Sequence, residues 1–499
     1  MELQFHKTVC PFLRQIKREV QNQELTQEVR LADGMPDIGR VLGAWGQTLI
    51  RSKEWRSGSM QISGGVNVWV LYAPEDGGQC ECVETWIPFQ MKWDLPDTDR
   101  DGKICTICRI RSADARSIAA RKLMVRTAVS VLAEAYAPDE AEITAPAEVP
   151  ADVQLLKNTY PVLLPVETGE KPFAMDEVLT LPGSMIPIEK VLRYSLQPEI
   201  TDQKVMGDKV VFRGSGMLHM LYLGTDGNLY GWEQEIPFSQ YAELENTYGQ
   251  DASASVAPVL TGMELDRGED GQLQLKAGLT GQYLIFDRQM IEVVEDAYSP
   301  NRKVTAEISG LQMPMVLEQS TQTVHGEASA PAEGTRVVDL AFYPEHGRVV
   351  HDDGKAVTEL SGQMQALYYD MEGNLQSVVL PWEDSLEMGA GQDAVTQAQT
   401  WPSGTPQGSL NGGNLYGRGD VLVNTVTLGA RGIPMLTALE IGELEQPDPG
   451  RPSLILRKAG DNRLWDLAKT CGSTVQAIQE ANGLTNEPDP KQMLLIPVL

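Results

Sequence analysis

The chain has 499 residues, of which 42% are hydrophobic, and a formal net charge of −28 at pH 7. A chain of this length exceeds one hydrophobic core and predicts several domains, while the ordinary apolar fraction excludes wholesale disorder. The acidity argues against nucleic acid and anionic membranes as partners, because both are polyanions.

The N-terminal segment 1–24 has no apolar stretch of signal-peptide length, and no apolar run approaches the roughly 20 residues that a membrane span needs. The six cysteines lie at uneven positions, unlike the framework of a secreted disulfide-rich protein. These features predict a cytoplasmic protein without membrane insertion.

The part of the chain before residue 451 contains three copies of one pattern. Each copy has a strand ending in Leu-Tyr, a turn with glycine, a second strand, and a proline followed by an aromatic residue. The copies lie at 64–89, 214–238 and 361–382, and their Leu-Tyr pairs are 150 and 146 residues apart. This period is far longer than a solenoid repeat, so the copies predict tandem domains.

Each copy predicts a β-hairpin. In 66–71 nearly every residue is apolar on both sets of alternate positions, which is typical of a strand covered on both faces. The segments EDGG, TDGN and MEGN place glycine where a hairpin turn needs a positive φ. The later proline ends the second strand, because it cannot extend a hydrogen-bonded ladder.

The flanks of the copies add strand signals. Segments 36–42 and 187–192 share a proline, an isoleucine and a Val-Leu pair in the same order. Alternating apolar residues favour strands at 125–131 and 421–427, although the Arg/Ala-rich stretch 115–124 leaves a helix open there. The predicted class is therefore mainly β, with three β-rich, sandwich-like domains.

Composition predicts the boundaries. The Ala/Pro/Glu-rich stretch 137–152 reads as a linker, and a second break lies near 298–303. Segment 445–452 contains three prolines, so we expect a semi-stiff linker that holds the C-terminal end clear of the acidic body. The predicted domains are 1–145, 150–300, 303–445 and 453–499.

Four cysteines of the first copy, in the patterns Cys80-x-Cys82 and Cys105-x-x-Cys108, would suit zinc by residue type. Strand periodicity argues against such a site, because residues three apart on a strand point to opposite faces. Positions 80 and 82 are also filled by other residue types in the other two copies. We predict no metal and no cofactor.

No catalytic constellation stands out in the sequence. The five histidines are scattered, and no Gly-x-Ser-x-Gly elbow is present. The glycine-rich segment 408–420 leads into a strand, which predicts a wide hairpin turn rather than a phosphate-binding loop. We therefore predict that the protein is not an enzyme.

The repeat pattern resembles a known domain. Pro-x-Ile-x-x-Val-Leu, followed by Gly-x-h-x-h-Leu-Tyr and Ile-Pro-Phe (h, hydrophobic), resembles the SPOCS domain of spore coat and sporulation proteins in endospore-forming bacteria. The third copy departs from this pattern, because it lacks the Pro-x-Ile element.

Residues 451–499 predict a small βααβ module. Apolar residues 454–456 form the first strand, and Asp461 or Asn462 caps the first helix after a turn. Ser473 with Gln476 fits a capping box for the second helix, Asn482-Gly483 ends it, and 494–496 close the sheet. The residues expected to face inward are Leu464, Leu467, Ala468 and Cys471 in the first helix and Val475, Ile478 and Ala481 in the second.

This order of elements resembles a LysM domain, which binds N-acetylated glycans in many proteins and other proteins in a few. The resemblance implies a groove between two loops. The candidate residues for binding a partner or a glycan are Gly460, Asp461, Asn462, Leu464, Trp465, Asn482, Gly483 and Leu484. Family members usually read Gly-Asp-x-Leu-Trp, and this chain has one additional residue in the loop that forms one wall. Trp465 either anchors the ligand or completes the small core.

Several SPOCS-like copies followed by one LysM-like module resemble the SipL-like family of spore-coat morphogenetic proteins. The resemblance implies a non-catalytic scaffold in the mother-cell cytoplasm, at the forespore surface. Its LysM domain would dock onto a SpoIVA-like ATPase of the coat basement layer, and its repeats would supply structural or self-association surfaces. Two alternatives stay open: a peptidoglycan- or cortex-binding protein that uses the groove for N-acetylglucosamine, and a phage-type assembly protein.

Overall fold

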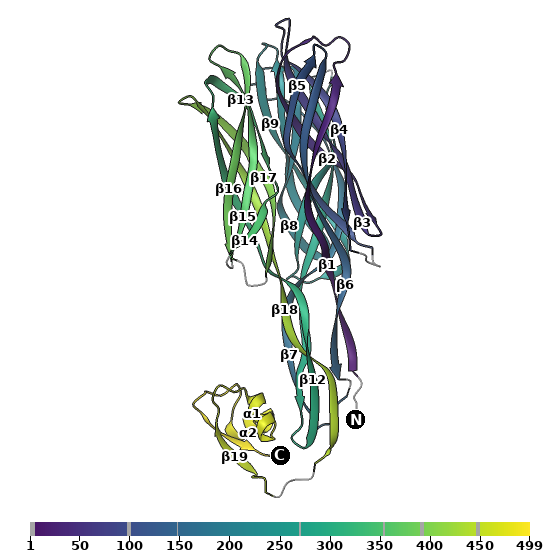
Figure 1. Ribbon diagram of the computed structural model, residues 1–499, viewed down its shortest axis with the longest axis vertical. Helices are drawn as coiled ribbons and strands as arrows, with labels where there is room; N and C mark the ends of the chain where they lie inside the picture. The colour runs from purple at the N-terminus through teal and green to yellow at the C-terminus, as the bar shows by residue number, and fades with distance from the viewer. Residues whose placement is uncertain are drawn as a thin grey trace.

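The computed structural model describes residues 5–96, 101–146, 148–268, 271–352, 355–389, 394–445 and 450–499. Long β-strands running along one axis dominate these residues, and two short helices lie near the C-terminal end (Figure 1). The predicted mainly β class is confirmed. Within the described part of the chain, no helix is both long and apolar enough to span a bilayer.

Unit 1, residues 5–146, contains two antiparallel sheets. One has the order β1-β6-β5 and the other β2-β3-β4, so the first strand of the unit pairs with its last. Val68 from one sheet and Val129 from the other are fully buried in the same core, which makes the unit sandwich-like, as expected. Its strands are β1 (Phe5–Arg30), β2 (Ile38–Arg56), β3 (Ser59–Pro74), β4 (Glu81–Asp94), β5 (Lys103–Ala119) and β6 (Lys122–Pro146).

Units 2 and 3, residues 154–298 and 302–444, repeat this plan. In each unit the first strand again pairs with the last, in the orders β10-β11-β7 and β12-β18-β17. The second sheet pairs β8 with β9 in unit 2, and β13, β14 and β16 with β15 in unit 3. The strands of unit 2 are β7 (Gln154–Leu179), β8 (Ile188–Gly224), β9 (Leu229–Tyr248), β10 (Ser253–Arg267) and β11 (Leu273–Tyr298). Those of unit 3 are β12 (Arg302–Pro331), β13 (Gly334–Pro344), β14 (Arg348–Asp352), β15 (Lys355–Asp370), β16 (Leu375–Gly389), β17 (Val395–Asn411) and β18 (Asn414–Leu444).

The repeated motifs occupy equivalent places in the units. The predicted hairpin turns are present, each with one glycine at positive φ: Gly77, Gly227 and Gly373, at 75°, 82° and 83°. The hydroxyl of Tyr72 donates to the carbonyl oxygen of Pro36 at 3.0 Å, and that of Tyr222 donates to Ile186 at 3.1 Å. The tyrosine of the Leu-Tyr pair thus fixes the proline-containing segment upstream in units 1 and 2.

Three local expectations are wrong. The supposed linker 137–152 continues β6 as far as Pro146, because Ala141 and Ile143 alternate toward a buried core that the Ala/Pro/Glu-rich composition obscures. The stretch 115–124 contains no helix: β5 ends at Ala119 and β6 begins at Lys122. The turn in 408–420 is tight rather than wide, with Gly412 and Gly413 both at positive φ between paired strands.

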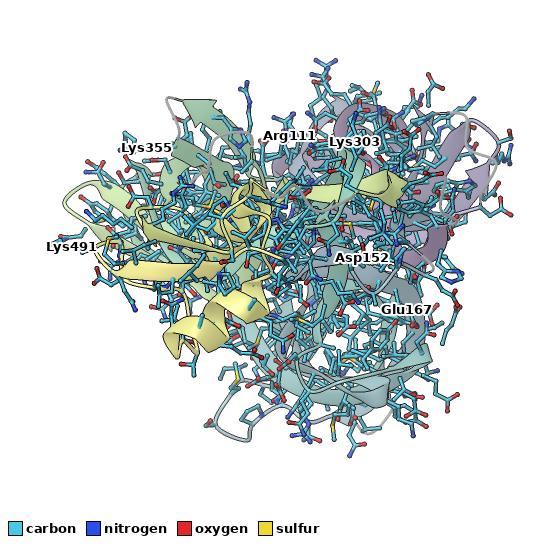
Figure 2. All side chains as sticks on the ribbon, turned by 90° about the horizontal axis from the view of Figure 1, so that it is seen from below. Arg111, Asp152, Glu167, Lys303, Lys355 and Lys491 are labelled. Atoms are coloured by element: carbon cyan, nitrogen blue, oxygen red, sulfur yellow. The ribbon has the colours of Figure 1, made fainter. Side chains whose placement is uncertain are left out.

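The three units pack around one common axis. The leucines of the three Leu-Tyr pairs, Leu71, Leu221 and Leu367, are fully buried in one cluster, together with Leu42 and Leu192. Viewed along the long axis, the purple, teal and green strands of the three units occupy separate sectors around it (Figure 2). The three hairpins therefore share one core where the units meet.

Basic residues at repeat-related positions close this arrangement into a ring. Arg40 of unit 1 donates to Gln376 of unit 3 at 2.9 Å. Lys190 of unit 2 pairs with Glu81 of unit 1, and Arg336 of unit 3 donates to the carbonyl oxygen of Leu229 in unit 2 at 3.0 Å. The three basic residues have the same 150- and 146-residue spacing as the Leu-Tyr pairs, so the units are related by an approximate threefold rotation.

Candidate functional site

The C-terminal module has the predicted βααβ order. Its elements are β19 (Leu454–Lys458), α1 (Leu464–Cys471), α2 (Val475–Asn482) and β20 (Met493–Pro497). The predicted inner face of α1 is confirmed, since Leu464, Leu467, Ala468 and Cys471 are all buried. In α2, Ile478 is buried, but Ala481 is exposed, contrary to expectation; Leu484, just beyond the helix, packs against the core.

Helix α1 does not begin with the predicted cap. Its N-cap is Arg463, which forms no capping hydrogen bond through its side chain. The carboxylate of Glu487 instead accepts a hydrogen bond from the backbone N–H of Leu464 at 2.8 Å. An anionic group is well placed at a helix N-terminus, where unpaired N–H groups and the helix dipole favour negative charge.

Helix α2 begins one residue later than expected. Thr474, not Ser473, is its N-cap, and the hydroxyl of Thr474 accepts from the N–H of Ala477 at 3.1 Å. Ser473 belongs to the end of α1, where its N–H donates to the carbonyl oxygen of Ala468 beside the left-handed Gly472. The stop at Gly483 is confirmed, with φ of 63°.

The Glu487 bond joins the two loops that the sequence assigns to a groove. Loop 460–463 lies on one side, with Asp461 and Asn462 exposed, and the segment from Gly483 to Glu487 lies on the other. Two of the candidate residues stabilise the fold of the module instead of lining the surface between the two loops. Leu464 is buried in the core, and the Asn482 side chain bonds both the N–H and the carbonyl of Leu495 in β20.

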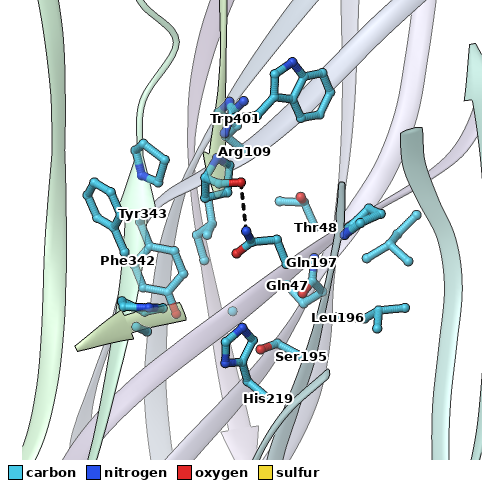
Figure 3. Close-up of a pocket in the computed structure, with 18 of the residues that line it drawn as sticks. Gln47, Thr48, Arg109, Ser195, Leu196, Gln197, His219, Phe342, Tyr343 and Trp401 are labelled. Atoms are coloured by element: carbon cyan, nitrogen blue, oxygen red, sulfur yellow. Dashed lines mark hydrogen bonds between the residues drawn. The ribbon is translucent and has the colours of Figure 1, made fainter. Parts of the chain in front are cut away.

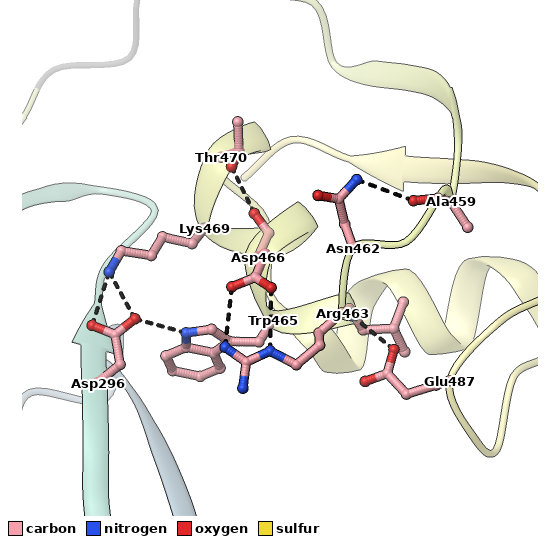
Figure 4. A network of polar contacts seen from close by, with 10 residues as sticks. Asp296, Ala459, Asn462, Arg463, Trp465, Asp466, Lys469, Thr470 and Glu487 are labelled. Carbon is pink, nitrogen blue, oxygen red and sulfur yellow. Dashed lines mark hydrogen bonds and ion pairs between the residues drawn. The ribbon is translucent and has the colours of Figure 1, made fainter. Parts of the chain in front are cut away.

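Trp465 faces the body of the protein. Its ring nitrogen Nε1 donates to Oδ2 of Asp296 at 2.9 Å, and Lys469 pairs with the same carboxylate at 2.7 Å (Figure 4). The ring meets Tyr298 edge-on with centroids 4.7 Å apart, and Trp465 is only 7% exposed. Asp296 and Tyr298 lie at the C-terminal end of β11, so Trp465 lies at an interface between the module and unit 2.

The expectation that the module stands clear of the body is therefore wrong. A further bond, from the Tyr298 hydroxyl to the carbonyl oxygen of Ser473 at 3.0 Å, adds to the contact. Residues 446–449 of the expected linker lie outside the described residues. In this arrangement residues 461–463 and 485–487 of the two loops remain exposed.

Replacing Asp296 with alanine should release the module from unit 2. The substitution removes the acceptor shared by Trp465 and Lys469, and we expect it to weaken docking by about 2 kcal/mol, as for a hydrogen-bonded charge. Hydrogen–deuterium exchange of α1 should rise while the module stays folded. Glu292→Ala is the matched control, since Glu292 lies on the same strand in an exposed pair with Lys157. Equal exchange in the two variants would contradict an anchoring role for Asp296.

Cys80, Cys82, Cys105 and Cys108 of unit 1 are free, partly buried thiols. Burial raises the pKa of Cys80 and of Cys108 to about 12, and that of Cys105 to about 11, so these thiols stay protonated at neutral pH. Among the described residues, no group of three or more His, Cys, Asp or Glu side chains is arranged to hold a metal ion.

Two family models match the chain. The family described as SipL, SPOCS domain matches residues 187–266, from the start of β8 to the end of β10, and the LysM domain family matches residues 458–497. No curated protein and no solved structure matches. The predicted resemblances are thus confirmed for the second repeat and for the C-terminal module, and both domains are binding domains rather than catalytic ones. Together they fit a sporulation protein associated with the spore coat.

Proposed function

We propose that this chain, as a carrier of a SipL SPOCS domain and a C-terminal LysM domain, is a non-catalytic scaffold of endospore coat assembly. It acts in the mother-cell cytoplasm at the forespore surface, and its LysM domain docks onto a basement-layer protein resembling the ATPase SpoIVA. We take its domains as 1–145, 150–300, 303–445 and 453–499.

The observation that carries the proposal is the placement of one binding module at the end of a long, closed body (Figure 1). The three units share a buried leucine cluster, so they form one stiff element rather than three independently moving domains. The module is close to neutral, with six basic and five acidic residues, whereas the body carries a net charge of −29. An acidic rod with a near-neutral tip is suited to a scaffold that attaches to its partner through the tip and extends its body away from the attachment site.

The repeats would recruit coat material. Three units with related strand plans surround one axis, and a partner with repeating sites could engage more than one of them. Such multivalent contact raises the effective concentration of each later binding step. Self-association of the scaffold through these faces belongs to the same proposal.

Removal of residues 451–499 tests the tethering role. A fluorescent fusion of the truncated protein should lose its forespore localisation and spread through the mother cell. Asp461→Arg, which adds bulk and positive charge to an exposed groove loop, should reduce localisation without unfolding the module. Gln476→Ala on the exposed face of α2 is its control. Unchanged localisation of the truncated protein would rule out LysM-dependent tethering.

The second candidate is a protein that binds peptidoglycan or spore cortex through N-acetylglucosamine, and the LysM match favours it. Loops 460–463 and 483–487 remain exposed for a sugar, while Trp465 is turned toward unit 2. A pull-down on purified peptidoglycan separates the candidates. Strong binding that chitin oligomers compete away supports the wall, and absence of binding supports the protein partner.

A further inference from the structure

The three-unit body is held together from within and repels other copies of the chain through its charge. Beside a cavity of about 170 Å³ where the units meet, Gln197 of unit 2 donates to the carbonyl oxygen of Pro402 in unit 3 at 2.8 Å (Figure 3). The net charge of −29 on the body opposes contact between two bodies. The C-terminal module, with six basic and five acidic residues, is the part of the chain where a second copy meets the least repulsion.

The two-stranded sheet of the module has an exposed apolar face. Its other face packs against the helices in the core of the module. The residues of the exposed face are large, apolar and 39–64% exposed: Leu454 and Leu456 in β19, and Met493 and Leu495 in β20. Because α1 contacts unit 2 through Trp465, on the helix side of the sheet, this face is turned away from the body (Figure 1).

Strand β19 is also an open edge of this sheet. In β20, the N–H of Leu495 donates to Oδ1 of Asn482 at 2.8 Å and its carbonyl oxygen accepts from Nδ2 at 2.6 Å, so both groups point away from β19. Leu456 lies directly opposite Leu495, and in such a pair of an antiparallel sheet both residues direct their backbone groups outward. The same alternation directs those of Leu454 and Lys458 outward, where no strand pairs with β19 among the described residues.

This edge is complementary to itself. In an antiparallel pairing centred on Leu456, the two Leu456 residues lie opposite each other, and Leu454 of each copy lies opposite Lys458 of the other. The outward N–H and C=O groups of all three residues then have partners. The two leucines pack together at the centre, and the aliphatic stem of Lys458 covers Leu454.

Charge does not oppose this pairing. Lys458 is the only charged side chain that β19, Leu454–Lys458, places on the exposed face. In the centred pairing its two copies are about 14 Å apart along the strands, beyond the Debye length of about 8 Å. We propose that two copies of this chain associate through β19 and form a continuous four-stranded sheet, in the order β20-β19-β19-β20, around a twofold axis.

Sedimentation velocity of the full chain measures this association. The mass should rise from 54.8 kDa toward twice that value with increasing concentration. We expect a Kd on the order of 10 µM, because few residues form the contact. Added salt should strengthen the association, since it screens the repulsion between the acidic bodies. A chain that stays monomeric at about 100 µM, tenfold above that Kd, or an association that salt weakens, would overturn the proposal.

Leu456→Lys tests the centre of the pairing. It places two positive charges directly opposite each other and should raise the Kd at least about tenfold. The side chain is 64% exposed, so the Tm of the monomer should not change. Leu495→Lys is the matched control, because it makes the same substitution on the same face but one strand away from the open edge. Equal weakening by the two variants would indicate contact between sheet faces and contradict strand pairing.

Leu456→Cys tests the register by proximity. The Cα atoms of residues that exchange both backbone hydrogen bonds are about 5.5 Å apart, within the range of a disulfide. Oxidised glutathione should therefore link two chains of this variant, which non-reducing electrophoresis detects. The parent, with its six native cysteines, and Leu495→Cys should stay unlinked under the same conditions. No linkage of Leu456→Cys, or equal linkage of Leu495→Cys, would rule out the proposed pairing.

Discussion

Replacing Leu221 with alanine should lower the free energy of unfolding by about 3 kcal/mol, within the range for buried leucines. Leu221 is 0% exposed and packs with Leu71 and Leu367 from the other two units. The substitution loses the transfer free energy of the side chain and leaves a cavity that three converging sheets cannot easily fill. Because the contact joins units, we also expect denaturation to become less cooperative.

Urea denaturation followed by intrinsic fluorescence provides the measurement for Leu221→Ala. The control is Leu317→Ala, which makes the same substitution at a leucine that is 50% exposed. The control should cost less than about 0.5 kcal/mol, as is usual for surface substitutions. Similar losses in the two variants would contradict a shared core between the units.

Replacing Arg193 with methionine should lower the free energy of unfolding by about 3–5 kcal/mol, the second large effect that we expect. Arg193 Nη2 lies 2.6 Å from Asp339 Oδ2, and the two side chains are only 4% and 13% exposed. The guanidinium also lies 5.3 Å from the ring centroid of Trp45. One side chain of unit 2 thus contacts units 3 and 1, and its loss leaves Asp339 buried without its ion-pair partner.

The double variant Arg193→Met with Asp339→Leu tests this reasoning, because it removes both charges. We expect it to recover most of the stability lost in the single variant, as found when buried pairs are replaced by apolar residues. Lys157→Met breaks an exposed pair with Glu292 and should change stability by less than about 1 kcal/mol. If the double variant is no more stable than Arg193→Met, the lost stability comes from packing and not from the unpaired charge of Asp339.

The hairpins were predictable because each repeat shows alternating or continuous apolar residues and a glycine turn. The threefold packing was not. Leu71, Leu221 and Leu367 stand in strand patterns that look the same whether a side chain is buried inside one unit or between several. The end of β6 was hidden for a different reason, since its Ala/Pro/Glu-rich composition is typical of a linker even though Ala141 and Ile143 alternate toward a core.

For the C-terminal module, the order of elements and the two loops followed from local signals, whereas the polar contacts did not. Asp296, the partner of Trp465, lies 169 residues away in sequence. Glu487 replaces the expected local cap from a separate loop. In a chain with 69 acidic residues, nothing local distinguishes these two carboxylates from the rest.

The ring of units also bears on how the chain is made. During synthesis unit 1 emerges first, but its Arg40 meets its partner Gln376 only after 336 more residues have been added. Until unit 3 arrives, the leucines of units 1 and 2 form an open apolar face, the kind of surface that promotes aggregation or chaperone binding. A prematurely terminated chain would keep that face uncovered, so closure of the ring distinguishes finished from unfinished molecules before any of them reaches an assembly site.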